Sequence, residues 1–179
     1  MIHGDIAPCP IPDDALLKTY SLNGGFADCY ATEIAGSISL AQYVAAFYTT
    51  PVFKLERLIL KYAVSMPSTD DEARQLAAGT IDRFAAWHVE ARRDNQLLMC
   101  DFQRRTRSWL MVAPTLHANG PQTRLYFGSG VVAMIDRKTG VASQGRVFRA
   151  LLGFHKVYSK VLLHAAKSRL QRSQRSPPA

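Results

Sequence analysis

The stretch RVFRALLGFHKVYSKVLLHAAKSRLQRSQR, residues 146–175, has the pattern of one long amphipathic helix. Its apolar residues recur at steps of three and four, which places them on one helical face. It also holds eight lysines and arginines and no acid, which equals the formal net charge of +8 for the chain. We expect a helix from Arg146 to about Arg172, whose apolar face packs against the rest of the fold. That face consists of Val147, Leu151, Phe154, Tyr158, Val161, Leu162 and Ala165.

Between residue 26 and Gly79, one strand followed by three shorter helices is predicted. Residues 26–34 alternate as a strand does, and two capping boxes follow, Ser39-Leu-Ala-Gln42 and Thr69-Asp-Asp-Glu72, each of which predicts a helix start. Pro51 separates the first helix from a second, because the residue before proline avoids helical backbone and proline suits the first helical position. Gly79 is expected to end the third helix. The second helix is expected to bury Val52, Leu55, Leu58, Ile59 and Tyr62.

After Gly79 the pattern changes to strands joined by short, turn-like links. Links this short favour an antiparallel meander. Gly128 and Gly130 lie inside the last strand, where they predict a bulge or a sharp bend. With the first strand, the sheet is expected to have about five strands. The four strands of the meander are expected at Phe84–Ala91, Gln96–Gln103, Arg107–Ala113 and Thr123–Met134.

The order of strand, helices, antiparallel meander and long C-terminal helix is an α+β pattern. Over residues 26–170 the chain resembles the START/Bet v 1-like superfamily, also called SRPBCC or helix-grip. Two stretches add to the resemblance, Arg124-Leu-Tyr-Phe-Gly-Ser-Gly-Val-Val132 and Phe148-Arg-Ala-Leu-Leu-Gly-Phe-His-Lys-Val-Tyr-Ser159. They are similar to the end of uncharacterised DUF2867-type proteins. The resemblance implies a curved antiparallel sheet that wraps the C-terminal helix, with two or three short helices after the first strand.

The resemblance also implies a function, because the superfamily generally binds apolar or amphipathic small molecules and includes some cyclases and hydrolases. We therefore expect an irregular N-terminal segment over residues 1–25, a single START-like domain over 26–172, and a disordered basic tail over 173–179. A ligand pocket is expected between the sheet and the C-terminal helix. It is expected to be lined mainly by apolar groups.

Several residues with suitable chemistry are expected near that pocket. His155 and Tyr158 are three positions apart on one helical face and could act as an acid–base pair, or a simple packed pair. Arg107 and Trp109 share a strand face, so a buried Arg107 could orient a ligand carboxylate or phosphate, or form a surface pair with Asp101. The expected ligand-binding residues are Arg107, Trp109, Tyr126, Leu151, His155, Tyr158 and Leu162.

Other kinds of site are not expected. The five histidines show no HxH or HExxH spacing, so no metal or other cofactor is predicted. Gly128-Ser129-Gly130 is not a nucleophile elbow, and the chain has no phosphate-binding loop motif. No stretch is apolar for long enough to cross a membrane. Three cysteines without CxxC spacing predict reduced thiols and a cytoplasmic location.

The favoured function is a binding protein that holds a small apolar or amphipathic ligand between the sheet and the C-terminal helix. The first alternative is a cyclase- or hydrolase-type enzyme, which needs at least two of Arg107, His155 and Tyr158 at one open volume. The second is a peripheral module that contacts an anionic membrane or nucleic acid through the basic helix, with Arg149, Lys156, Lys160 and Lys167 exposed together. No nucleic-acid motif accompanies the charge, so nucleic acid is not the expected partner, whereas membrane contact stays open.

Overall fold

The structure is a computed structural model, and it describes most of the chain. The backbone is described for residues 5–22, 25–118, 120–132, 134–135, 142–143 and 146–175. Within these ranges, the side chains of 59–61, 63–64, 134–135, 142–143 and 146–156 lie outside the description.

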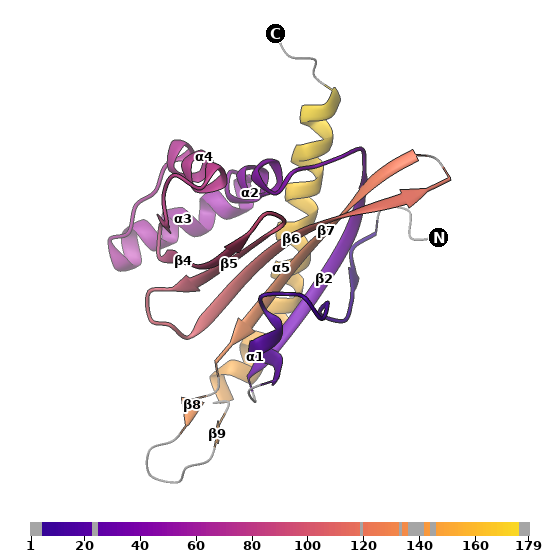
Figure 1. The fold of residues 1–179 in the computed structure, drawn as a ribbon. Helices are drawn as coiled ribbons and strands as arrows, with labels where there is room; N and C mark the ends of the chain where they lie inside the picture. Colours follow the sequence, from indigo (N-terminus) through magenta and orange to yellow (C-terminus); the bar gives the residue numbers. More distant parts are fainter. Residues whose placement is uncertain are drawn as a thin grey trace.

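A curved antiparallel sheet of seven strands forms the centre of the fold (Figure 1). Both long strands of the β6–β7 hairpin lie inside the sheet, and β2 pairs with β7 over ten residues. The predicted meander is therefore confirmed, and two short edge strands, β1 and β3, extend the expected five strands to seven. The spatial order is β1 (Ala7–Pro8), β2 (Phe26–Ala35), β7 (Gly120–Val131), β6 (Thr106–His117), β5 (Gln96–Asp101), β4 (Trp87–Arg93) and β3 (Arg83–Phe84). A separate pair consists of β8 (Met134–Ile135) and β9 (Ala142–Ser143).

The helices begin where the capping signals predict. The Ser39 capping box starts α2 (Leu40–Tyr48), and the Thr69 capping box starts α4 (Asp70–Ala78). Between them, Pro51 is the first residue of α3 (Pro51–Val64). Gly79 ends α4 in the left-handed conformation, with φ of 77°, which glycine adopts without a Cβ clash.

The long helix α5 (Arg146–Arg175) extends three residues beyond the expected end at Arg172, into the predicted tail. Residues 176–179 lie outside the described part of the chain. Within the described side chains, Leu162, Leu163, Ala166 and Leu170 are buried, whereas Val161 is 42% exposed. Val161 was expected on the buried face, so that prediction is wrong. Compared with the expected face, the buried face of α5 is rotated about the helix axis, so that it includes Leu163 and Ala166 in place of Val161.

The two faces of the sheet are covered by different parts of the chain (Figure 1). Helices α2 to α5 cover one face, where the main core gathers around Phe47, Leu97, Leu110 and Leu125. The N-terminal segment, including α1 (Lys18–Leu22), covers the other face. The smaller core on that face consists of Ala15, Leu17, Cys29, Leu98, Trp109 and Met111.

The N-terminal segment is more ordered than the expected irregular stretch. Its strand β1 pairs with β2, and side chains from the sheet bind its backbone. The Gln96 amide oxygen accepts from the Leu16 N–H at 2.9 Å, and the Arg93 guanidinium donates to the Asp14 carbonyl at 2.8 Å. The segment is therefore a layer of the fold.

Gly128 is packed against this N-terminal layer. The pairing of β7 with both neighbours runs through Gly128 without a shift, so the predicted bulge is wrong. A Cβ atom at Gly128 would lie 2.6 Å from Leu17 Cδ2 and 2.9 Å from both Trp109 Cε3 and the Asp28 carbonyl oxygen. The glycine is needed for close approach. A shift in register occurs instead in β4, between Val89 and Ala91.

Candidate functional site

A cavity of about 470 Å³ lies on the helix-covered face of the sheet. Most of its wall is apolar, and its volume falls within the range typical of small-molecule sites. A surface hollow of similar size, about 480 Å³, is lined by charged residues that include Asp82, Arg83 and Arg104, and it is less suited to an apolar ligand. The described residues that line the apolar cavity are Phe47, Val52, Phe53, Leu55, Glu56, Trp87, Thr106, Arg107, Ser108, Phe127, Ser129, Gly130, Val131, Tyr158 and Leu162.

Four different elements contribute the apolar wall. Phe47 of α2 lies between Phe53 of α3 and Phe127 of β7, with ring centroids 6.0 Å and 4.9 Å away respectively. Leu162 of α5 adds a buried aliphatic side chain. Phe47 is fully buried, so this part of the wall is fixed by the packing of the main core.

One carboxylate lies in this apolar wall. The Tyr158 hydroxyl of α5 donates a hydrogen bond to Glu56 Oε2 of α3. Burial raises the pKa of the Glu56 carboxyl, and the hydrogen bond from Tyr158 offsets this shift only in part. Burial and the neighbouring carboxylate also raise the pKa of the Tyr158 phenol, which keeps its proton on the hydroxyl. Glu56 is therefore a strong hydrogen-bond acceptor inside a mainly apolar cavity.

Trp87 of β4 lies beside this pair. Its indole N–H is buried and, among the described residues, has no hydrogen-bond partner of standard geometry. It is still close enough to Glu56 to favour the charged form of the carboxylate. A buried donor without a full partner costs free energy, so a polar atom between Trp87 and Glu56 would be stabilised there.

Only some of the expected ligand-binding residues have side chains that line the cavity in the described part of the structure. The side chains of Tyr158 and Leu162 line the cavity, whereas those of Leu151 and His155 lie outside the described part of the structure. Arg107 lies at the cavity wall, but its guanidinium is on the opposite side of the sheet. There it stacks over the Tyr20 ring at 4.6 Å from the centroid, and its Nε lies 2.5 Å from Glu90 Oε2.

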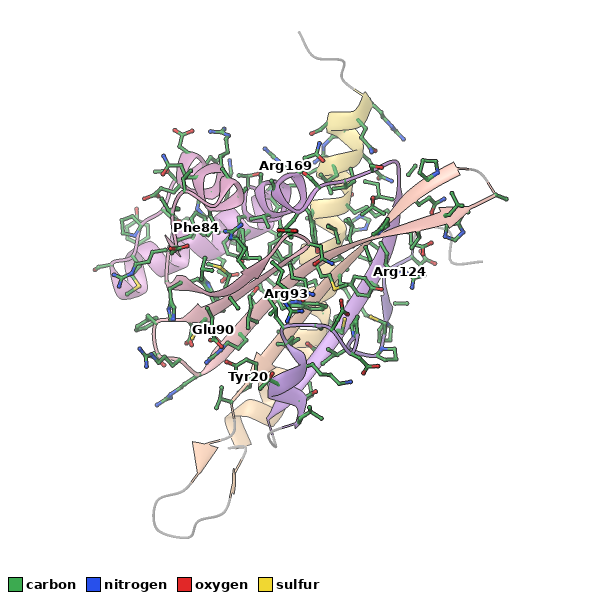
Figure 2. All side chains as sticks on the ribbon, in the orientation of Figure 1. Tyr20, Phe84, Glu90, Arg93, Arg124 and Arg169 are labelled. Carbon is green, nitrogen blue, oxygen red and sulfur yellow. The ribbon has the colours of Figure 1, made fainter. Side chains whose placement is uncertain are left out.

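Figure 2 shows Tyr20 and Glu90 approaching each other beside α1. The Tyr20 hydroxyl donates to Glu90, so Arg107, Glu90 and Tyr20 form one cluster on the N-terminal side of the sheet. The predicted pair of Arg107 with Asp101 is wrong. Asp101 Oδ1 instead accepts from the backbone N–H groups of Arg105 and Thr106, at 2.7 and 2.9 Å, and so closes the β5–β6 turn.

Trp109 and Tyr126 also face the N-terminal segment. Trp109 is fully buried, its indole N–H donates to Gln96 Oε1 at 3.0 Å, and its ring lies 6.1 Å from that of Tyr126. Alternation correctly places Trp109 on the same strand face as Arg107. That face is turned away from the cavity and is covered by the N-terminal segment. The sequence pattern did not reveal this layer.

Sequence reasoning missed Glu56 and Trp87. The second helix was expected to bury Leu55, Leu58 and Tyr62, but these are 59%, 49% and 76% exposed, so that prediction is wrong; Ile59 lies outside the described side chains. The buried side of α3 instead includes Phe53 and Arg57. Arg57 Nη1 binds Asp70 Oδ1 at 2.7 Å, which joins α3 to α4. A signal was present, since Glu56 lies four positions after Val52 and thus on the same face.

The basic face of α5 is only partly as expected. Lys160 is exposed and lies near the Tyr30 ring, whereas the side chains of Arg149 and Lys156 lie outside the described part. Lys167 was expected to be exposed, but it is 6% exposed, and its ammonium donates to Thr32 Oγ1 at 3.0 Å. Burial lowers the pKa of Lys167. This lysine therefore contacts the sheet and does not belong to an open basic surface.

Within the described residues, no group of three or more His, Cys, Asp or Glu side chains is arranged to hold a metal ion. In the same part of the chain, no helix combines the length and the apolar character needed to cross a membrane. Comparisons of the chain with models of protein families, with curated proteins and with solved structures found no match.

Proposed function

We propose that this protein binds a small apolar or amphipathic molecule in the cavity between the sheet and helices α3 and α5. The observation that carries the proposal is the cavity of about 470 Å³, whose wall combines Phe47, Phe53, Phe127 and Leu162 with few polar groups. Burying an apolar ligand there would gain roughly 25 cal/mol for each Å² removed from water. The helix-grip resemblance implies a ligand site in the same place.

The proposal is tested with Nile red, an uncharged dye whose fluorescence rises in apolar surroundings. We expect saturable binding to the full chain. Thr106→Trp and Val52→Trp each place a large ring at the cavity wall and should weaken dye binding about tenfold or more. Leu116→Trp is the matched control, because Leu116 is 84% exposed near the tip of the β6–β7 hairpin and does not line the cavity.

Circular dichroism melts establish that each variant is folded. If folded Thr106→Trp and Val52→Trp proteins bind the dye as tightly as the Leu116→Trp protein, the dye is not in the cavity and the proposal fails. Two cavity variants from different elements are used, because one overpacked variant can unfold.

A further inference from the structure

We propose that the ligand carries a hydroxyl group, which binds between the Glu56 carboxylate and the Trp87 indole N–H. This inference rests on the proposed function and narrows it to a ligand class, an apolar molecule with one alcohol group. Carboxylate and phosphate ligands are disfavoured.

The charge of the cavity supports this choice. Of the described lining residues, Glu56 and Arg107 carry formal charges, and the Arg107 guanidinium is held on the opposite face of the sheet by Glu90 and Tyr20. A ligand anion would therefore meet the Glu56 carboxylate without a cation from the described wall. Like charges in a buried site repel, so an anionic head group is disfavoured beside Glu56.

The hydrogen-bonding groups support it further. Glu56 offers acceptor oxygens and already binds the Tyr158 hydroxyl, while Trp87, which lines the same cavity, has a buried N–H donor without a partner of standard geometry in the described structure. An alcohol both donates and accepts, so it satisfies Glu56 and Trp87 at once. An ether can only accept, and a protonated amine can only donate. The pair of protein groups thus selects a hydroxyl.

The remainder of the cavity suits the apolar body of such a ligand. Phe47, Phe53, Phe127 and Leu162 supply an apolar lining, and Ser108 and Ser129 add small side chains to the same wall. The Ser129 hydroxyl is already engaged, since its Oγ donates to Asp28 Oδ1 at 2.6 Å. Glu56 and Trp87 are therefore the lining residues with which an uncharged polar head group gains most.

The test compares three ligands that each carry a linear alkyl chain of nine or ten carbons as competitors of Nile red: decanol, decanoate and decyl methyl ether. We expect decanol to bind at least about tenfold more tightly than either of the others. A hydrogen bond to a charged group is worth about 1.5–3 kcal/mol, and a tenfold difference in affinity corresponds to about 1.4 kcal/mol. Glu56→Gln removes the charge at nearly constant shape. It should reduce the discrimination between decanol and decanoate to about threefold or less.

Trp87→Phe removes the indole donor and should weaken decanol and the ether by a similar factor, because both accept from Trp87. Saturable Nile red binding together with equal affinities for the three competitors would overturn the hydroxyl site and leave the proposed function standing. The loss of cavity-dependent Nile red binding would instead overturn the proposed function. An unchanged ligand preference in folded Glu56→Gln protein would contradict the role of Glu56.

Discussion

Glu56 of α3 and Tyr158 of α5 are 102 residues apart in the chain, yet the tyrosine hydroxyl donates to the glutamate carboxylate at the cavity wall. The hydrogen bond joins α3, the second helix after the first long strand, to the C-terminal helix α5. It also places a carboxylate where burial raises its pKa. Glu56 thus links the stability of the fold to the chemistry of the candidate site.

The raised pKa of Glu56 predicts how stability depends on pH. The folded state holds the Glu56 proton more tightly than the unfolded chain, in which glutamate titrates at about 4.3. The contribution of Glu56 to stability is therefore fully present below that value and is lost as pH rises through the higher folded-state pKa. Gln at position 56 does not titrate. We therefore expect the free energy of unfolding of Glu56→Gln, measured relative to that of the natural protein, to increase as pH rises. Urea denaturation from mildly acidic to mildly alkaline pH measures this difference, and a constant difference would contradict the assignment.

Arg107 should matter for stability but not for binding. Arg107→Met removes the ion pair with Glu90 and the stacking on Tyr20, so we expect the free energy of unfolding to fall by about 1–3 kcal/mol. Because the guanidinium lies on the face opposite the cavity, the affinity for decanol should stay within about twofold. Chemical denaturation and Nile red competition measure the two effects. A large loss of decanol affinity in folded Arg107→Met protein would show that Arg107 reaches the ligand.

Gly128→Ala should destabilise the fold through steric overlap. The added methyl group would lie within 3 Å of Leu17, of Trp109 and of the Asp28 carbonyl oxygen, so we expect a loss of about 1–3 kcal/mol. Gly130→Ala is the matched comparison, because its nearest neighbour would be Leu17 Cδ1 at 3.1 Å. Thermal melts of the two variants measure the difference. An equal effect would mean that the N-terminal layer is not packed on Gly128 as described.

Cys9 and Cys29 should form a disulfide under oxidising conditions. Their Sγ atoms are 3.2 Å apart, and the hydrogen bond with Cys29 lowers the pKa of the Cys9 thiol, which favours its reactive thiolate. Exchange with one oxidised glutathione would join the two sulfurs and release two molecules of glutathione. The crosslink closes a loop of about 20 residues and should raise the free energy of unfolding by roughly 3 kcal/mol.

Peptide mass spectrometry identifies the crosslinked pair, and Cys9→Ser is the control that should show no stabilisation by the oxidant. Cys100 is 1% exposed and should remain a thiol. Recovery of Cys9 only as a mixed disulfide with glutathione would contradict the predicted proximity of the two thiols.

Local signals in the sequence were sufficient for most of the element order. Capping at Ser39 and Thr69, the proline at position 51 and the glycine at position 79 each act through neighbouring backbone groups, so their effect can be read without knowing the fold. The short links after Gly79 likewise predicted the antiparallel meander. The α+β class with a C-terminal helix followed from this order.

The candidate site was harder to predict, because it depends on which face of each element meets which layer. Alternation grouped Arg107 with Trp109, but it carries no information on whether helices or the N-terminal segment cover that face. In α3, the apolar side chains of Leu55 and Tyr62 match a helical stripe, which predicts that they are core residues, yet both are exposed. Glu56 was overlooked because a glutamate is rarely buried without a partner, and its partner Tyr158 lies in a distant helix.

The most direct test of the central claim is a methyl NMR titration of the full chain with decanol. Val52 and Leu162 line the cavity, whereas Leu98 is buried on the opposite face of the sheet. We predict saturable shifts for the methyl groups of Val52 and Leu162 and no comparable shift for Leu98. Shifts confined to exposed residues such as Leu116, or no saturable shift at Val52 and Leu162, would contradict the account.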